Sequence, residues 1–284
     1  MRNLIIRTSV AAVTIPIILW ISYRGGLWLI GMVGLFAMLA MFEFVYAEGY
    51  RPRHVLFWIG PAWLGAVLYG LWNAAPAGII GFESALAPFW MPGLWSLGFV
   101  LVGGMIFAVG KQSPEELFNK YTRYLWGVLY ITALYPFVVS VGQGKLFVDS
   151  GGDNLLFLFG LLWVGDTAAM GFGKWLGKHK LAPTVSPNKT VEGFVGGIIG
   201  AAAIGVLMIF WKFSAWPWYH VLILAVGCSV FGQLGDLVES MWKRSLGIKD
   251  SSSIIPGHGG VLDRFDSLLF AAPFMFFYLV ALSS

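Results

Sequence analysis

Nine apolar stretches of about 20 residues divide this chain, and a bilayer core of roughly 30 Å requires an apolar helix of that length. The stretches cover residues 4–22, 27–47, 55–73, 94–110, 124–142, 154–173, 192–212, 217–240 and 264–282. Composition agrees, because 58% of the residues are hydrophobic and only 11% are charged, whereas soluble domains have roughly a quarter of their residues charged. We therefore expect an all-α, polytopic transmembrane bundle of about nine spans.

The basic residues predict how this bundle is oriented. With nine spans, 15 of the 18 lysines and arginines lie on the same side as the N-terminus. Cytoplasmic loops carry the excess of basic residues. We therefore expect a multi-pass protein of the cell inner (cytoplasmic) membrane, with a cytoplasmic N-terminus and the C-terminus outside. We expect the chain to form one integral membrane unit. Residues 1–110 would form the N-terminal transmembrane helices, and residues 111–284 the C-terminal transmembrane helices that carry the candidate nucleotide and metal site.

Acidic residues gather at the ends of the last two apolar stretches. Asp236 and Glu239 are three residues apart, as are Asp263 and Asp266, so within a helix each pair shares one face. A carboxylate at the centre of a membrane span costs at least about 2.5–3.5 kcal/mol, which favours a common partner. We expect Asp236 and Asp263 to share a divalent cation, and oxygen ligands favour Mg²⁺. Solvated charges or helix-capping carboxylates are an equally good interpretation of Asp266 or Glu239 taken alone.

The stretch KRSLGIKDSSSIIPGHGGVLDRFDS, residues 243–267, adds basic residues and glycines to these acids. Backbone N–H groups of Gly259 and Gly260, just before a helix start, can bind an oxyanion. A bare phosphate there would be repelled by Asp263 and Asp266 unless a metal ion lay between them. This combination is typical of a magnesium–nucleoside triphosphate site. The candidate phosphate-binding cations are Lys243, Arg244, Lys249 and Arg264.

Two further residues of this stretch are candidates for other roles. His258 is interpreted as a phosphate or loop-ordering contact rather than a general base, because an attacking phosphate is already ionised near neutral pH. Asp250 is a weaker metal candidate, as is Asp266.

A second polar loop, GDTAAMGFGKWLGKHKLAPTVSPNKTVEG, begins at Gly165. Its segment SPNKT fits a proline-stiffened turn that binds a base, ribose or phosphate. It fits equally well an ordinary loop in which Thr190 caps the seventh span, and the segment alone does not decide between them. The candidate nucleotide-binding residues on this loop are Asp166, Ser186, Pro187, Asn188 and Lys189.

The two polar stretches together resemble the phosphatidate cytidylyltransferase (CDP-diacylglycerol synthase) family. Sixteen positions fit its signature: Ser240, Lys243, Arg244, Lys249, Asp250, Ser252, Ile255, Pro256, His258, Gly259, Gly260, Val261, Asp263, Arg264, Phe265 and Asp266. Trp242 departs from it, standing where an aliphatic residue or Phe is usual, and we expect this change to affect packing rather than chemistry. The segment GKHKLAPTVSPNKTVEG is also similar to the family, with Asn188 where a second lysine is common.

The resemblance implies a reaction in which CTP and phosphatidic acid give CDP-diacylglycerol and pyrophosphate. It also implies Mg²⁺ as cofactor and a polar cavity that faces the cytoplasm. The expected partners are the lipid bilayer and a second copy of the chain in a homodimer, and no nucleic acid is expected as a partner. Whether a monovalent cation joins Mg²⁺ is left open.

Two other classes of function share some of these sequence features. A cation transporter or channel also has intramembrane carboxylates, but it is expected to carry them near the midplane of several helices, whereas these acids share one end with a basic loop. Related CTP-dependent lipid enzymes, such as a polyprenol kinase or an archaeal lipid cytidylyltransferase, are distinguished by nucleotide preference and product mass.

Overall fold

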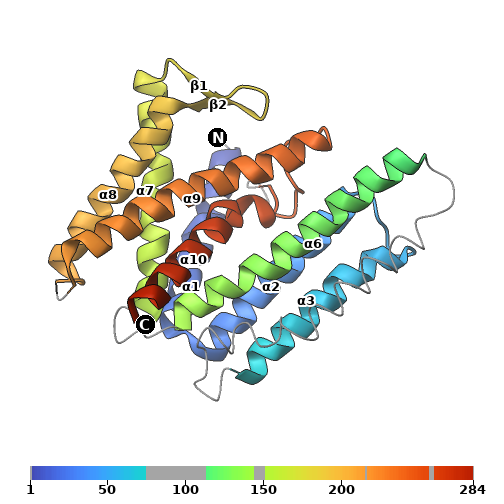
Figure 1. The fold of residues 1–284 in the computed structure, drawn as a ribbon, viewed down its shortest axis with the longest axis horizontal. Coiled ribbons are helices and arrows are strands. Elements are labelled where there is room, and N and C mark those ends of the chain that lie inside the picture. Colours follow the sequence, from blue (N-terminus) through green and yellow to red (C-terminus); the bar gives the residue numbers. More distant parts are fainter. Residues whose placement is uncertain (1, 75–112, 144–150, 215, 256–258, 284) are drawn as a thin grey trace.

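The computed structural model describes residues 2–74, 113–143, 151–214, 216–255 and 259–283. Within these ranges the chain folds into helices joined by short loops, with one small antiparallel hairpin (Figure 1). The elements in chain order are α1 (Arg2–Arg24), α2 (Gly26–Ala47), α3 (Val55–Ala74), α6 (Pro114–Gln143), α7 (Gly151–Leu176), β1 (Lys180–Ala182), β2 (Ser186–Thr190), α8 (Val191–Trp211), α9 (Trp218–Ser245) and α10 (Leu262–Ser283).

These helices confirm the predicted all-α membrane bundle. Eight of the nine expected spans coincide with a helix. Seven of these agree at both ends to within a few residues, whereas the eighth, α6, begins ten residues earlier than expected. The remaining expected span, residues 94–110, lies outside the described residues, so the span count stays a prediction. Seven of the described helices are long and apolar enough to cross a bilayer. The chain is therefore a multi-pass membrane protein.

The helix ends lie at two opposite sides of the bundle. On one side lie the N-terminus, the α2–α3 connection, the start of α6, the β1–β2 hairpin and the α9–α10 loop (Figure 1). The α1–α2 and α8–α9 connections and the end of α10 lie on the other side. The two polar stretches found in the sequence therefore occupy the same side of the molecule.

Close helix packing holds the second half of the chain together. Helices α7 and α8 contact each other along much of their length, because small residues face each other between them. A Cβ on Gly200 of α8 would lie 2.5 Å from the Cβ of Ala168 in α7, so only glycine permits this approach. Helix α10 crosses the centre of the bundle and contacts α9, α6, α7 and α2.

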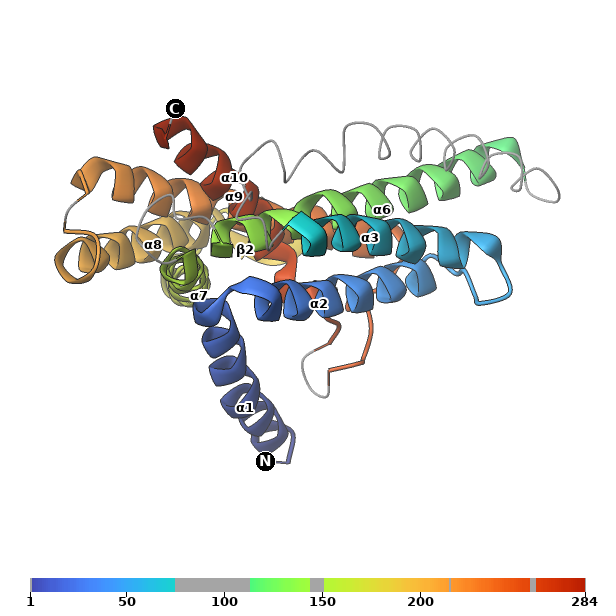
Figure 2. The same cartoon turned by 90° about the horizontal axis from the view of Figure 1, so that it is seen from below.

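Helix α1 stands apart from this arrangement. It contacts α7 and α2 and then leaves the bundle at a steep angle (Figure 2). Large apolar side chains on it, such as Val13, Ile17 and Trp20, are exposed, as expected of a surface that faces lipid. The space between α1, α7 and α10 forms part of the candidate site.

Candidate active site

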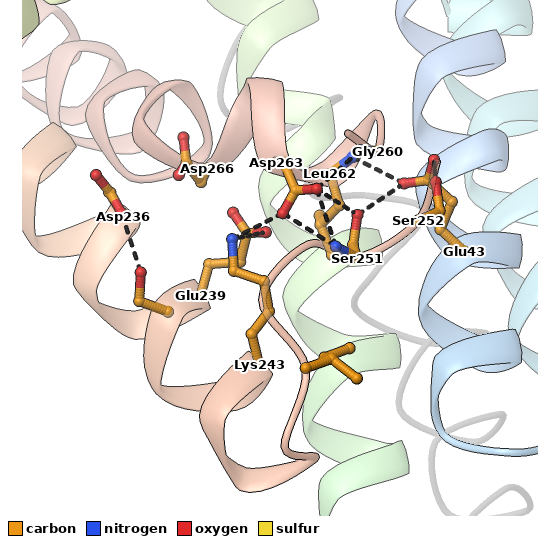
Figure 3. A network of polar contacts seen from close by, with 12 residues as sticks. Glu43, Asp236, Glu239, Lys243, Ser251, Ser252, Gly260, Leu262, Asp263 and Asp266 are labelled. Carbon is orange, nitrogen blue, oxygen red and sulfur yellow. Dashed lines mark hydrogen bonds and ion pairs between the residues drawn. The ribbon is translucent and has the colours of Figure 1, made fainter. Parts of the chain in front are cut away.

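A buried lysine lies between two carboxylates where α9 meets α10 (Figure 3). The Nζ of Lys243 is 3.2 Å from Oε1 of Glu239, one turn earlier in α9, and 2.7 Å from Oδ1 of Asp263 in α10. Lys243 is only 8% exposed and Glu239 only 1%. Charges at this depth are stable only when paired, so the three side chains form one unit. Glu239 is thus a buried ion-pair partner and not a solvated loop charge.

Asp263 also organises the glycine turn before α10. Its Oδ2 accepts hydrogen bonds from the backbone N–H of Gly260 at 2.8 Å and of Ser251 at 2.9 Å, and from the Ser251 hydroxyl at 3.1 Å. Gly259 has φ +83°, a backbone conformation that favours glycine. The sequence suggested that the N–H groups of these glycines face a bound oxyanion. In this structure the Gly260 N–H is directed to Asp263, because that carboxylate lies in the first turn of α10.

Sequence reasoning missed Glu43, near the C-terminal end of α2. Its carboxylate accepts hydrogen bonds from the hydroxyls of Ser251 and Ser252 and from the backbone N–H groups of Val261 and Leu262 (Figure 3). The available signal was a lone carboxylate inside an apolar stretch, which usually marks a functional or buried polar site. Its partners lie more than 200 positions away, so the signal could not have identified them.

The second polar loop reaches the same region through Lys189. Its Nζ lies 2.6 Å from Oδ2 of Asp236 in α9, and the hydroxyl of Ser240 donates to Oδ1 of Asp236 at 3.2 Å. The prediction of a turn at SPNKT is wrong, because residues 186–190 form strand β2, paired antiparallel with β1. The capping alternative is confirmed, since the Thr190 side chain accepts from the Gly193 N–H at 3.1 Å.

A pocket of about 350 Å³ lies between α1, α7 and α10. One part of its wall is polar and carries Asp166, Asp263, Arg264 and Asp266, whereas most of the rest is apolar and includes Ile18, Phe36 and Phe159. Asp236 lies within electrostatic range of both Asp166 and Asp266. The pocket therefore joins a carboxylate cluster to an apolar surface.

The remaining predicted site residues lie on more exposed segments. Arg244, in the last turn of α9, is exposed. Lys249 and Asp250 after the end of that helix are also exposed, as are Pro187 and Asn188 on β2, whereas Ser186 is half-buried. Arg244 donates through Nε to the backbone oxygen of Val185 at 3.2 Å, so it connects α9 to the β1–β2 hairpin. His258 lies outside the described residues.

A second missed carboxylate, Glu48, follows α2 and explains the packing of Trp242. The Trp242 Nε1–H donates to Oε1 of Glu48 at 2.9 Å, and Arg123 Nε lies 3.4 Å from Oε2. Both Trp242 and Glu48 are buried. The residue that departs from the signature therefore joins α9 to α2, and this contact agrees with a role in packing.

The residues present fit a magnesium ion that is shared with phosphate groups. In the described part of the chain, no three His, Cys, Asp or Glu side chains converge closely enough to hold a metal ion alone. Mg²⁺ commonly binds through one or two carboxylates together with substrate phosphates and water, and Asp236 and Asp263 meet that requirement in donor type. Both carboxylates now face lysines, so a bound cation would have to share or replace those contacts.

Comparison with known proteins identifies relatives of this chain. A protein of Staphylococcus saprophyticus subsp. saprophyticus named phosphatidate cytidylyltransferase is 50% identical over 143 residues, which cover 49% of this chain and 55% of the relative. Proteins of the same name from Staphylococcus haemolyticus and Staphylococcus aureus (strain COL) are 46% identical over 143 residues and 45% identical over 145 residues, with the same coverage. The chain thus spans about half the length of these relatives. The model of the cytidylyltransferase family matches residues 5–282. Because that match extends over nearly the whole sequence, the chain belongs to the cytidylyltransferase family.

Proposed function

We propose that this protein transfers the cytidylyl group of CTP to phosphatidic acid, giving CDP-diacylglycerol and pyrophosphate. The observation that carries the proposal is the pocket between α1, α7 and α10, which combines a cluster of charged side chains with an apolar wall. Such a pocket suits a substrate with an anionic headgroup and acyl chains. The relatives named phosphatidate cytidylyltransferase support the same assignment.

The proposed reaction is a displacement at the α-phosphorus of CTP. An oxygen of the lipid phosphate forms a bond to that phosphorus, the bond from the phosphorus to the bridging oxygen breaks, and its electron pair leaves with pyrophosphate. No proton has to be removed from the ionised lipid phosphate. The main barrier is the approach of two anions, so catalysis rests on positioning and on neutralising charge.

Each part of the site has a proposed role in this reaction. Lys243, Arg264 and the more exposed Arg244 and Lys249 would contact phosphate groups, and His258 would contact phosphate or order the loop. Asp236 and Asp263 would hold Mg²⁺, with Asp250 and Asp266 as weaker candidates and a monovalent cation as a further possible ion. When bound, the metal would neutralise triphosphate charge. The nucleotide would be bound by Asp166, on the polar part of the pocket wall, and by Ser186, Pro187, Asn188 and Lys189 on β2.

The membrane arrangement is part of the proposal. The distribution of basic residues supports a cytoplasmic N-terminus and a C-terminus outside, and this would place the site at the inner leaflet of the cytoplasmic membrane. Acyl chains of the substrate would then remain in the bilayer while the headgroup reacts. A homodimer is proposed from the family resemblance alone. Its mass in detergent, measured by light scattering, tests it.

One assay tests the proposed activity directly. Purified protein in detergent is incubated with Mg²⁺, phosphatidic acid and either CTP or ATP, and lipids and pyrophosphate are quantified. We expect pyrophosphate and a lipid with the mass of CDP-diacylglycerol in equal amounts, with CTP only. Replacing phosphatidic acid with a polyprenol tests the kinase alternative. A phosphorylated polyprenol, or no product from phosphatidic acid, would contradict the proposal.

A further inference from the structure

The buried carboxylate of Glu43 binds a single loop that is distant in sequence. Glu43 is 3% exposed, and its four donors all lie in the segment between α9 and α10 or at the start of α10. The Ser252 hydroxyl donates to Oε1 at 2.6 Å and the Ser251 hydroxyl to Oε2 at 3.2 Å. The backbone N–H of Val261 donates to Oε1 at 2.8 Å, and that of Leu262 to Oε2 at 3.0 Å.

Two of these donors belong to the N-terminus of α10. The first N–H groups of a helix have no partner within the helix, and a negative charge near them is favourable because of the helix dipole. A nearby Ser, Thr, Asp or Asn usually supplies this contact. Here it comes from a different membrane helix, so Glu43 fixes where α10 begins. Asp263 is the second residue of α10, and its position follows directly.

The loop leaves no space for this contact to shift. Ser251 lies between the two carboxylates, with its hydroxyl oxygen 3.2 Å from Glu43 Oε2 and 3.1 Å from Asp263 Oδ2. A Cβ added to Gly260 would overlap that hydroxyl and lie 2.7 Å from Glu43 Oε2. Any movement of Glu43 is therefore passed on to Ser251 and from there to Asp263.

We infer that Glu43 is a positioning residue, which holds the α9–α10 loop so that Asp263 and Lys243 keep the geometry needed for phosphate transfer. This role rests on the proposed function for its kinetic consequences, but the structural part stands independently of it. Glu43 does not line the pocket between α1, α7 and α10, so it acts through its contacts with the loop.

The first test is hydrogen exchange in the substrate-free protein. Glu43→Gln keeps the size of the side chain but removes its charge and directs an NH₂ group toward donors. We expect the amides of Val261 and Leu262 to exchange roughly tenfold faster or more, since bonds to a charged acceptor are being weakened. Glu48→Gln is the matched control, because Glu48 is also buried but binds Trp242 and Arg123. Equal exchange of these two amides in both variants would overturn the inference.

The second test separates positioning from general stability. We expect Glu43→Gln to lower kcat and to raise the Mg²⁺ concentration needed for half-maximal rate, and Glu48→Gln to change neither at temperatures where both variants are folded. If Glu43→Gln does not fold, Ser252→Ala, with Ser253→Ala as control, removes one donor and is expected to give the same changes to a smaller degree. Unchanged kinetics in the folded Glu43 or Ser252 variant would refute the role. A wild-type protein that makes no CDP-diacylglycerol would refute the proposed function but would leave the exchange result to decide the structural claim.

Discussion

The ion pairs of Lys243 give a prediction about stability that the structure makes specific. Replacing Lys243 with Met keeps an unbranched side chain, one atom shorter, and removes its charge. Asp263 retains hydrogen bonds from Ser251 and Gly260, but Glu239, at 1% exposure, loses the counter-charge that the described residues provide. Breaking a buried ion pair by removing one partner costs about 3–5 kcal/mol, so we expect Lys243→Met to be destabilised by that amount.

A second substitution tests whether Glu239 is the cause. In the Lys243→Met background, Glu239→Gln removes the unpaired charge, and we expect it to recover most of the lost stability. Asp263→Asn in the same background should recover much less, because Asp263 keeps its backbone donors. Thermal unfolding in detergent, followed by circular dichroism, measures these four proteins and the Glu239→Gln single variant. With that variant a double-mutant cycle gives the interaction free energy between Lys243 and Glu239. If Lys243→Met unfolds like the wild type, or if Glu239→Gln destabilises it further, the buried ion-pair argument is wrong.

Three further predictions concern activity and the glycine turn. Asp263→Asn should abolish formation of CDP-diacylglycerol in detergent, while the protein remains folded and monodisperse in detergent micelles. Retained turnover would exclude Asp263 from the proposed metal site. EDTA should stop the reaction and added Mg²⁺ should restore it, and a rate that EDTA does not change would exclude the proposed metal. Gly260→Ala should destabilise the protein by about 1–3 kcal/mol through overpacking against Ser251 and Glu43, and should reduce turnover. The control Gly31→Ala, whose added Cβ would face open space beside α2, should be neutral or slightly stabilising. Equal unfolding temperatures for the two variants would contradict this account.

The helices were predictable because the bilayer restricts them. A span must be apolar and about 20 residues long, so the apolar stretches predicted helix bounds that agree with the structure to within a few residues, except at the start of α6, which begins ten residues earlier. The β1–β2 hairpin was missed because Pro187 and Asn188 are poor strand formers. Its pairing depends on β1, which lies across a short turn. Local propensity therefore gave the wrong structure for residues 186–190, while the cap at Thr190, one of the two interpretations of this segment, is confirmed.

The candidate site was predictable only in part. Asp263, Lys243 and the glycines stand close in sequence, so their proximity follows from one loop and two helix ends. The contacts of Lys189 with Asp236 and of Glu43 with Ser251 join segments that are far apart, and no periodicity or spacing in the sequence indicates which side chains meet. Glu43 was visible as an unusual acid within an apolar stretch, but its partners were fixed only by the tertiary packing of α2 against α10.

The long separation between Glu43 and its donors has a consequence for biosynthesis. Glu43 is made 208 residues before Ser251, and at about 5–20 residues per second the ribosome needs roughly 10–40 s to produce that length. During this interval α2 has to enter or approach the membrane with an acidic side chain whose final donors do not yet exist. Complete insertion of α2 is therefore expected to be a late event, finished only when the α9–α10 loop and α10 arrive.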